Sequence, residues 1–389
     1  MKKRVMEARL QAWAKQYPVV TQTGPRQSGK TTLARAAFPD YGYSNLELPS
    51  EREWARTDPE SFLDRFAGGV VLDEIQRVPD LLSHVQVRVD SDRGARGRYI
   101  LTGSHNLQLM RGVSQSLAGR TALGTLLPFS LAEAYGNRPP EDPMESIWRG
   151  FFPRVVADGL DPTEAMEFYA ATYVERDVRE LLNVKDLSKF SAFLRLCAGR
   201  TGQLLNAADL AADAGIAGKT ALEWISLLEA SYIVRRLPPW FSNASKRLAK
   251  TPKLYFTDTG LACALLGIRS PAQLWSHPLR GAIFETYAVG ELWKRECNRG
   301  GTGGLFHYRD GRKREIDLVG ETGNGLVLSE VKSGKTPSSE WAATLRELSA
   351  LLPEVCALRV IYGGNILQKR GDVTFIPWNQ IELAWNRFG

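Results

Sequence analysis

Residues Gly24 to Thr31 read GPRQSGKT, and this stretch lies between an apolar run, Pro18 to Thr23, and a helical pattern that begins at Lys30. The order predicts a strand, a loop and a helix. Two more apolar strands are predicted at Gly68 to Glu74, GGVVLDE, and at Arg98 to Ser104, RYILTGS. Short β-branched runs separated by helical patterns predict an α/β fold with a parallel sheet in roughly the first third of the chain.

The composition is that of a globular chain with several domains. The chain has 389 residues, 43% of them hydrophobic and 24% charged, with a net charge of +7. We expect two or three domains, a cytoplasmic location without membrane association, and a charge that suits a polyanionic partner. The four cysteines form no CxxC pair, which predicts buried thiols and no disulfide framework: Cys197, Cys263, Cys297 and Cys356.

The loop fits the pattern GxxxxGK[ST], which binds phosphates when it lies between a strand and a helix. Gly24 and Gly29 let the backbone curl so that successive N–H groups face a phosphate, helped by the N-terminus of the following helix. Lys30 is expected to reach the β- and γ-phosphates, and the Thr31 hydroxyl to hold Mg²⁺. The predicted nucleotide-binding residues are Gly24, Pro25, Arg26, Gln27, Ser28, Gly29, Lys30, Thr31 and Thr32.

Two adjacent carboxylates end the second predicted strand, VVLDE. Asp73 is placed to bind the metal with its water shell, and Glu74 to polarise an attacking water. The alternative is that both acids simply face solvent at a strand end. Their position after a phosphate-binding loop favours the catalytic interpretation.

Four stretches of the first half, GPRQSGKTT, LDEIQRVP, ILTGS and SLAGR, resemble the AAA+ branch of P-loop ATPases. They are similar in particular to prokaryotic ATPases whose C-terminal half is a domain of unknown function. The stretches NASKRLAKTPKLYFTDTGL and FETYAVGEL also fit that family, so the resemblance covers nearly the whole chain. It implies ATP as the nucleotide, with Mg²⁺, and ATP hydrolysis as the activity.

The resemblance implies roles for four further residues. Ser104, or Thr102 beside it, would be the polar sensor at the end of the third strand. Arg120 would be an arginine finger that points into the nucleotide of a neighbouring subunit, and Arg176 a second sensor in the lid. A finger acting in trans implies a homo-oligomeric ring. The alternative for each arginine is an ordinary surface charge.

Changes of pattern divide the chain into four predicted segments. The turn-rich stretch NRPPEDP, Asn137 to Pro143, separates the sheet domain from helical sequence. The expected boundaries are an ATPase core at residues 1–136, a helical lid at 137–186, a winged-helix domain at 187–250, and a nuclease-like α/β domain at 251–389.

The winged-helix prediction depends on two helices joined by a glycine-containing turn, LNAADLAADAG and KTALEWISLLEA, followed by an apolar strand. Lys219, at the start of the second helix, and the wing residues Arg235 and Arg236 are candidate DNA-phosphate contacts. The alternative is a protein-docking module, because acidic residues dilute the face.

A second candidate site lies near the C-terminus, in VLSEVKSG. Glu330 and Lys332 are two apart on a predicted strand and share one face. Asp317 lies one hairpin earlier, and Glu285 begins the helix expected beneath that hairpin. These four residues resemble the PD-(D/E)xK nuclease site, which implies catalytic roles for all four and Mg²⁺ bound by Asp317 and Glu330. Nearby basic residues are candidate phosphate contacts: Arg309, Arg312, Lys313 and Arg314.

The alternative for the ExK pair is an exposed ion pair of little energetic value, and a nuclease-like fold can also bind without cutting. Three functions remain open. The first is an ATP-hydrolysing protein that acts on duplex, single-stranded or branched DNA. The second is a nucleotide-dependent switch that binds a protein partner, and the third is an ATP-regulated defence nuclease.

Overall fold

The computed structural model describes residues 2–92, 94–104, 113, 115–173, 186–242, 250–301, 303–352 and 354–385. The chain forms two compact units. The first comprises Met1–Phe129, Ala230–Tyr232 and Glu296–Thr302, and the second comprises Ser130–Glu229, Ile233–Arg295 and Gly303–Gly389. Across the described ranges, every helix is too short or too polar to cross a bilayer.

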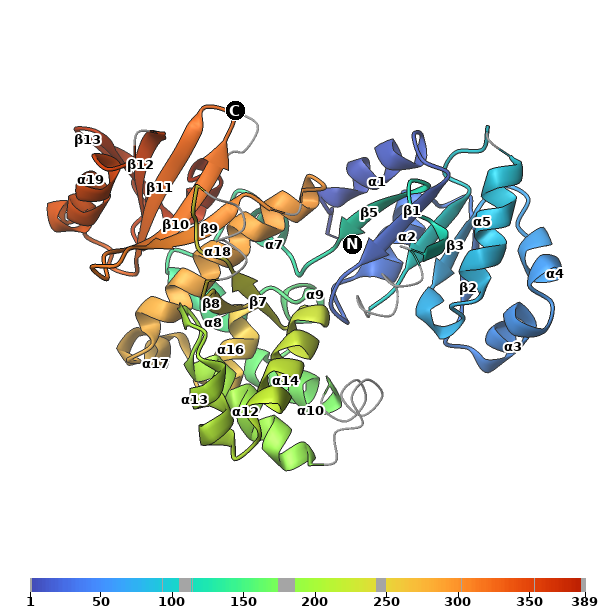
Figure 1. Cartoon of the computed structure of the whole chain (residues 1–389), viewed down its shortest axis with the longest axis horizontal. Coiled ribbons are helices and arrows are strands. Elements are labelled where there is room, and N and C mark those ends of the chain that lie inside the picture. The colour runs from blue at the N-terminus through green and yellow to red at the C-terminus, as the bar shows by residue number, and fades with distance from the viewer. Residues whose placement is uncertain are drawn as a thin grey trace. The chain divides into compact units, whose positions relative to one another are not determined.

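The first unit is built on a five-stranded sheet with the order β2-β3-β4-β1-β5, and all its neighbouring strands are parallel (Figure 1). This confirms the predicted parallel sheet. Because β4 lies between β1 and β3, the carboxyl ends of these three strands meet at one edge. The strands are β1 (Val19–Thr23), β2 (Gly42–Asn45), β3 (Val70–Asp73), β4 (Tyr99–Thr102) and β5 (Thr121–Thr125).

Helices cover both faces of this sheet. Successive side chains of a strand point to opposite faces, and every residue of β1, β3 and β4 is buried, so both faces must be covered. Val20, Val71 and Ile100 pack in one core with α1 and α2, whereas their neighbours Val19 and Leu72 pack in another with α3, α4 and α5. The helices are α1 (Met6–Ala14), α2 (Lys30–Ala37), α3 (Pro49–Thr57), α4 (Pro59–Asp64) and α5 (Leu81–Ser91), and a 3₁₀ turn, η1 (Ile75–Arg77), follows β3.

The second unit begins with helices and a small antiparallel sheet of order β6-β8-β7. The helices are α7 (Leu131–Tyr135), α8 (Pro143–Arg149), α9 (Pro153–Ala157), α10 (Pro162–Tyr173), α12 (Leu187–Gly199), α13 (Ala207–Ala214), α14 (Gly218–Ala230), α16 (Thr259–Leu265) and α17 (Pro271–Ser276). The strands are β6 (Gln203–Leu204), β7 (Val234–Leu237) and β8 (Lys253–Phe256).

One hydrophobic core crosses the expected boundaries at residues 186 and 250. It joins Phe152 and Tyr169 of the expected lid to Phe193 and Trp224 of the expected winged helix, and to Phe256 beyond it. A segment of about 50 or 60 residues buries a smaller fraction of its apolar surface by itself, and here the segments share one interior.

The C-terminal part of the second unit is a six-stranded mixed sheet, β13-β14-β12-β11-β10-β9. The strands β10 and β11 form the predicted hairpin, whose last pair is Thr322 with Gly325. The strands are β9 (Leu305–Arg309), β10 (Glu315–Thr322), β11 (Gly325–Lys332), β12 (Val355–Tyr362), β13 (Gln368–Arg370) and β14 (Val373–Pro377). The remaining elements are α18 (Arg280–Asn298), α19 (Ala343–Ser349), η3 (Ser339–Ala342) and η4 (Trp378–Leu383).

Two local expectations need correction. The helix α18 begins at Arg280, just after Pro278, so Glu285 lies in its second turn and not at its start. Cys356 is exposed, whereas Cys197, Cys263 and Cys297 are buried as expected. Cys356 lies in β12, and the pairing of β12 with β14 begins only at Leu358.

Candidate functional site

The phosphate-loop motif lies between β1 and α2, and two glycines give it its shape. Gly24 has φ 145°, and a Cβ there would lie 2.1 Å from the carbonyl oxygen of Leu126. Gly29 precedes α2 with φ 90°, a left-handed conformation that favours glycine. A side chain at either position would distort the loop, which explains the spacing of the two glycines.

Lys30 is buried and folded against the loop. It is only 5% exposed, and its Nζ donates to the carbonyl oxygens of Gly24 and Pro25 at 3.0 and 2.8 Å. Arg4 supports the same loop, because its Nη1 donates to the carbonyl oxygen of Ser28 at 2.9 Å and its Nη2 to that of Leu127 at 2.6 Å. The loop is therefore held by cations on buried side chains.

Asp73, at the end of β3, accepts hydrogen bonds from three hydroxyl groups. Thr31 Oγ1 donates to both of its carboxylate oxygens, at 3.0 and 2.9 Å, and the Tyr43 hydroxyl donates at 3.0 Å. The Thr102 hydroxyl, at the end of β4, is the third donor. The structure thus brings together the two predicted metal-binding residues, Thr31 and Asp73.

Glu74 follows Asp73 with φ 56°, a left-handed conformation that is uncommon outside glycine. Ser104 Oγ donates to one of its carboxylate oxygens at 2.8 Å, and Gln76 donates to the other. Burial raises the pKa of Glu74, but Lys30, these two hydrogen bonds and Arg26 outweigh burial and hold the pKa below its usual range. Glu74 is therefore ionised at neutral pH and its orientation is fixed.

The predicted arginine finger is engaged within its own unit. Arg120 Nε lies 2.6 Å from Asp90 Oδ1, and Arg120 Nη2 lies 2.9 Å from Asp90 Oδ2. Its carbonyl oxygen accepts from the Val19 amide, so Arg120 lies at the amino end of β1, opposite the phosphate loop. Arg176, the other predicted nucleotide contact of this kind, lies outside the described residues.

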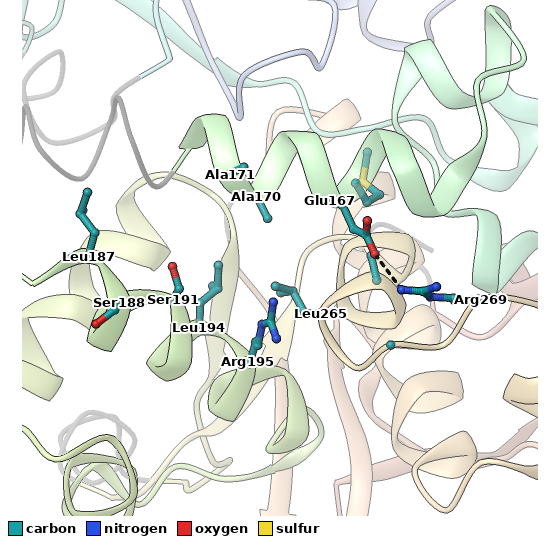
Figure 2. Close-up of a pocket in the computed structure, with 13 residues that line it drawn as sticks. Glu167, Ala170, Ala171, Leu187, Ser188, Ser191, Leu194, Arg195, Leu265 and Arg269 are labelled. Carbon is teal, nitrogen blue, oxygen red and sulfur yellow. Dashed lines mark ion pairs between the residues drawn. The ribbon is translucent and has the colours of Figure 1, made fainter.

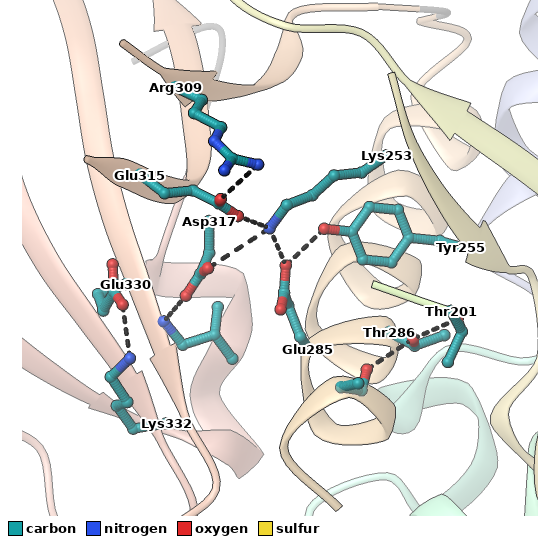
Figure 3. Close-up of polar contacts among 12 residues, drawn as sticks. Thr201, Lys253, Tyr255, Glu285, Thr286, Arg309, Glu315, Asp317, Glu330 and Lys332 are labelled. Carbon is teal, nitrogen blue, oxygen red and sulfur yellow. Dashed lines mark hydrogen bonds and ion pairs between the residues drawn. The ribbon is translucent and has the colours of Figure 1, made fainter. Parts of the chain in front are cut away.

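Two of the four predicted C-terminal residues, Glu285 and Asp317, lie around a cation that was not selected from the sequence (Figure 3). Lys253 Nζ of β8 lies 2.9 Å from Glu285 Oε1, 3.6 Å from Asp317 Oδ1 and 2.5 Å from Glu315 Oε1. Tyr255, two residues further on the same face of β8, donates its hydroxyl to Glu285. We call Lys253, Glu285, Glu315 and Asp317 the lysine-centred cluster.

Glu330 and Lys332 pair with each other, as their spacing predicts. Lys332 Nζ lies 2.5 Å from Glu330 Oε1, and Glu330 Oε2 is buried without a hydrogen-bond partner among the described residues. Burial, with Asp317 nearby, raises the pKa of Glu330 to about 8 and that of Glu285 to about 7. Glu330 is therefore mostly buried, unlike the exposed ion pair of the alternative interpretation.

The candidate nucleic-acid contacts differ in accessibility. Arg235 stacks over the Trp293 ring at 4.5 Å, and Arg236 Nε donates to Glu229 Oε2 at 2.7 Å. Lys219 is 89% exposed at the first turn of α14. In the basic stretch after β9, Arg314 pairs with Asp310 and Glu347.

A separate pocket of about 620 Å³ lies in the second unit between α10, α12 and the loop after α16 (Figure 2). One part of its lining is apolar, including Ala170 and Leu265, and Glu167 pairs with Arg269 across 3.8 Å at its edge. No local stretch of sequence predicts this pocket, because its lining comes from three separate segments.

Four residues that shape the two sites were not selected from the sequence. Lys253 had a readable signal, because a lysine in the apolar strand KLYF must bury its stem and find carboxylate partners. Tyr255 follows from the same strand alternation. Arg4 and Tyr43 carry no such signal, since only the fold brings them to the phosphate loop and to Asp73.

Comparisons with known proteins match three regions of the chain. A family described as an AAA domain matches residues 16–135, which include the phosphate loop, Asp73, Glu74, Ser104 and Arg120. Two families described as domains of unknown function, DUF8612 and DUF4143, match residues 140–272 and 280–381.

Two curated relatives extend over almost the whole chain. They are the uncharacterized proteins Rv2008c of Mycobacterium tuberculosis and Mb2031c of Mycobacterium bovis. Each is 30% identical over 388 residues, which is 98% of this chain and 85% of the relative.

Solved structures give weaker likenesses. The Walker-type ATPase PABY2304 of Pyrococcus abyssi has a TM-score of 0.43 at 15% identity, over 68% of this chain and 96% of that one. AMPPCP-bound DnaA of Aquifex aeolicus has a TM-score of 0.29 at 17% identity, over 58% of this chain and 86% of that one.

Proposed function

The chain belongs to the same family as the two mycobacterial proteins and carries an AAA-type ATPase domain, and from this premise we propose that it hydrolyses ATP to act on DNA. The observation that carries the ATPase part is the convergence of Thr31, Thr102 and Tyr43 on Asp73, beside a fixed and ionised Glu74. A loop threonine, a metal-binding aspartate and an acid that positions water are parts that phosphoryl transfer to water uses beside a phosphate loop.

The phosphate loop would hold the nucleotide through its amides, the N-terminus of α2 and Lys30. Lys30 is buried among carbonyl oxygens, so its ammonium would exchange these contacts for phosphate oxygens at short range. Anion binding at a helix N-terminus needs no other cation, but Lys30 would stabilise the charge that develops on the transferred group.

The donors at Thr31 and Asp73 fit Mg²⁺. This ion prefers oxygen ligands and keeps several of its waters, so one hydroxyl and one carboxylate suffice beside the phosphates. Thr31 and Asp73 would hold it, and when bound it would neutralise charge on the phosphate oxygens. Tyr43 and Thr102 would orient the Asp73 carboxylate through their hydroxyl groups.

Glu74 would orient the attacking water and accept its proton. Its lowered pKa keeps it ionised, and Ser104 and Gln76 fix both of its oxygens. Ser104 is thus a positioning residue in this proposal, which gives the predicted sensor a physical role. Thr102 has the equivalent role for Asp73.

Arg120 would complete the site of a neighbouring copy. It lies at the amino end of β1, and five strand residues at about 3.3 Å each separate that end from the loop, so its own nucleotide is out of reach. A finger role would require Arg120 to leave Asp90 and the protein to form a homo-oligomer, such as a ring. Sedimentation with and without a non-hydrolysable ATP analogue tests this assembly.

Action on DNA is the finer part of the proposal. It is supported by the net charge of +7, by the exposed Lys219 on α14, and by the helix and strand order that predicts a winged helix. ATP turnover should be measured with linear, single-stranded and junction DNA at low and physiological salt. If no DNA changes the ATPase rate and no DNA binds at low salt, the proposed action on DNA is wrong. The proposed ATPase activity would not be affected by that result.

A nucleotide-dependent switch that binds a protein partner is the second candidate. The observation that favours it is that Arg235 and Arg236, two predicted phosphate contacts, already have partners within the chain in Trp293 and Glu229. A stoichiometric partner that is released on exchange of ADP for ATP, with no DNA effect on turnover, is the result that would support it.

A further inference from the structure

The lysine-centred cluster surrounds one ammonium group with three carboxylates. Lys253 is 2% exposed, and Glu285, Glu315 and Asp317 all lie within 3.6 Å of its Nζ (Figure 3). The carboxylates come from α18 and β10, and the lysine comes from β8. Carboxylates that converge on one buried point require a cation, and here a side chain supplies it.

Lys253 is a fixed part of the structure. The strand β8 is central in its sheet, with Lys253 opposite Leu204 of β6 and Leu237 of β7. Tyr255 on the same strand donates to Glu285, so a second contact holds the same carboxylate. Strand pairing thus fixes the Lys253 backbone, and burial holds its side chain beside the carboxylates.

Two further oxygens of the site have an amide or cationic partner, whereas Glu330 Oε2 is buried without one among the described residues. Asp317 Oδ2 accepts from the Val331 amide at 2.8 Å, and Glu330 Oε1 accepts from Lys332. Within the described residues, no three His, Cys, Asp or Glu side chains are arranged to hold a metal ion. Mg²⁺ binds carboxylate oxygens at about 2.0–2.1 Å. The Lys253 ammonium already lies between the Glu285 and Asp317 carboxylates, where such an ion would have to bind.

We propose that the Lys253 ammonium takes the place of a divalent cation in this cluster, so that the site fastens β8 to α18 and β10 and does not cleave phosphodiester bonds. The inference is independent of the ATPase proposal, since it uses residues of the second unit alone. It gives Glu285 and Asp317 a structural role in place of the catalytic role predicted from the sequence.

The test is Mn²⁺ binding without nucleotide, counted by the loss of the free-ion electron paramagnetic resonance signal. An Asp73→Asn background removes the metal ligand of the nucleotide site. In the Asp73→Asn background, adding Asp317→Asn should leave the number of bound Mn²⁺ ions unchanged, because the cluster binds none while Lys253 is present. Lys253→Ala should create one such site, and adding Asp317→Asn to it should abolish that site.

Thermal unfolding supplies the second readout. Lys253→Ala should lower the midpoint by roughly 10 °C, because it leaves buried carboxylates uncompensated. Mn²⁺ should restore part of this loss in Lys253→Ala and have no effect on the background protein. Lys253→Arg keeps the positive charge and should lower the unfolding midpoint less than Lys253→Ala does. Lys250→Ala, at an exposed position of the same segment, is the matched control.

Three results would overturn the proposal. The first is a Mn²⁺ site in the Asp73→Asn background that Asp317→Asn or Glu330→Gln removes. The second is metal-dependent DNA cleavage by the wild-type chain that Glu330→Gln abolishes. The third is a folded Lys253→Ala protein that gains no Mn²⁺ site. If Lys253→Ala does not fold, Mn²⁺ binding to the Asp73→Asn background with and without Asp317→Asn still tests the proposal. ATPase turnover of the wild-type chain is a separate measurement, which tests the proposed ATPase function.

Discussion

Glu74 combines an uncommon backbone conformation with a carboxylate that is held at both oxygens. Its backbone is left-handed, at φ 56°, and its carboxylate is held at both oxygens by Ser104 and Gln76. Backbone strain of this kind costs about 1–3 kcal/mol and persists where the surrounding structure fixes it. At the residue scale, this is the strongest indication that Glu74 has a chemical role.

Glu74→Gln should keep the hydrogen-bonding shape and lose the charge. We expect kcat for ATP hydrolysis to fall by about 10²-fold or more, because the general base is removed. ATP affinity should stay within about threefold, since Lys30 and the loop are unchanged. Phosphate release and binding of a fluorescent ATP analogue measure the two quantities.

The exposed Glu53 on α3 is the control for this variant, and Glu53→Gln should change neither quantity. Loss of nucleotide binding in Glu74→Gln would indicate that Glu74 supports the loop and would contradict the catalytic role.

His307 on β9 gives a pH-dependent prediction. Burial lowers the pKa of His307, and the nearby charges of Lys253 and Arg309 lower it further. Glu315 acts in the opposite direction, and the resulting pKa is about 4. The unfolded chain binds this proton near pH 6.5, so it holds more protons than the folded chain between about pH 6.5 and 4. Neutral His307 therefore contributes stability above that window, and the contribution is lost as the pH falls through it.

His307→Leu should flatten the fall in the unfolding midpoint between pH 6.5 and 4, relative to the wild type. The measurement is thermal unfolding across this range, with the half-exposed His84 mutated to Gln as the control. Equal pH profiles for His307→Leu and the wild type would contradict the assignment.

At the element scale, the turn after α14 is tied to the end of β1. The Tyr232 hydroxyl lies 2.7 Å from Thr23 Oγ1, and Thr23 is the residue before Gly24. Tyr232 has φ 60°, and Ala230–Tyr232 belong to the first unit although Glu229 and Ile233 belong to the second. The chain therefore contributes a short segment from the middle of its sequence to the ATPase unit.

Tyr232→Phe should destabilise the first unit by about 1 kcal/mol, the net value of one hydrogen bond. The loss stays small because Thr23 Oγ1 also lies 3.3 Å from Thr125 Oγ1. Hydrogen exchange at β1 amides should rise in this variant. Tyr17→Phe, at an exposed tyrosine of the same unit, is the control, and equal exchange in both variants would refute the prediction.

At the scale of the whole molecule, the cysteines report on the two units separately. Cys297 lies in the last residues of α18, which belong to the first unit although the rest of that helix belongs to the second. Cys197 and Cys263 belong to the second unit. Burial raises the pKa of Cys197 to about 12 and raises the pKa of Cys263, which makes both thiols unreactive in the folded chain. Cys356 is exposed.

Iodoacetamide should therefore modify Cys356 alone in the native protein. With increasing urea, ATP should shift the labelling of Cys297 to higher concentration, because a ligand stabilises the unit that binds it. Cys197 and Cys263 should shift less. Peptide mass spectrometry gives each curve, and an identical ATP shift at all three buried thiols would contradict independent unfolding of the two units.

The sequence by itself determined the elements whose signals are local. The glycines at 24 and 29, the lysine at 30 and the alternation in VVLDE predict strand, loop, helix and acid pair, because backbone conformation and strand periodicity act over a few residues. The ETGNG turn likewise predicted the hairpin that places Asp317 beside Glu330 and Val331.

Only the tertiary structure decided what those residues contact. Thr102, from β4, meets Asp73 because β4 lies between β1 and β3, and no local pattern gives that strand order. Lys253 and Glu285 are 32 positions apart, yet their burial together turns a metal-like set of acids into an ion cluster. Long-range burial sets the charge of such groups, because desolvation and neighbouring charges depend on every segment that packs around them.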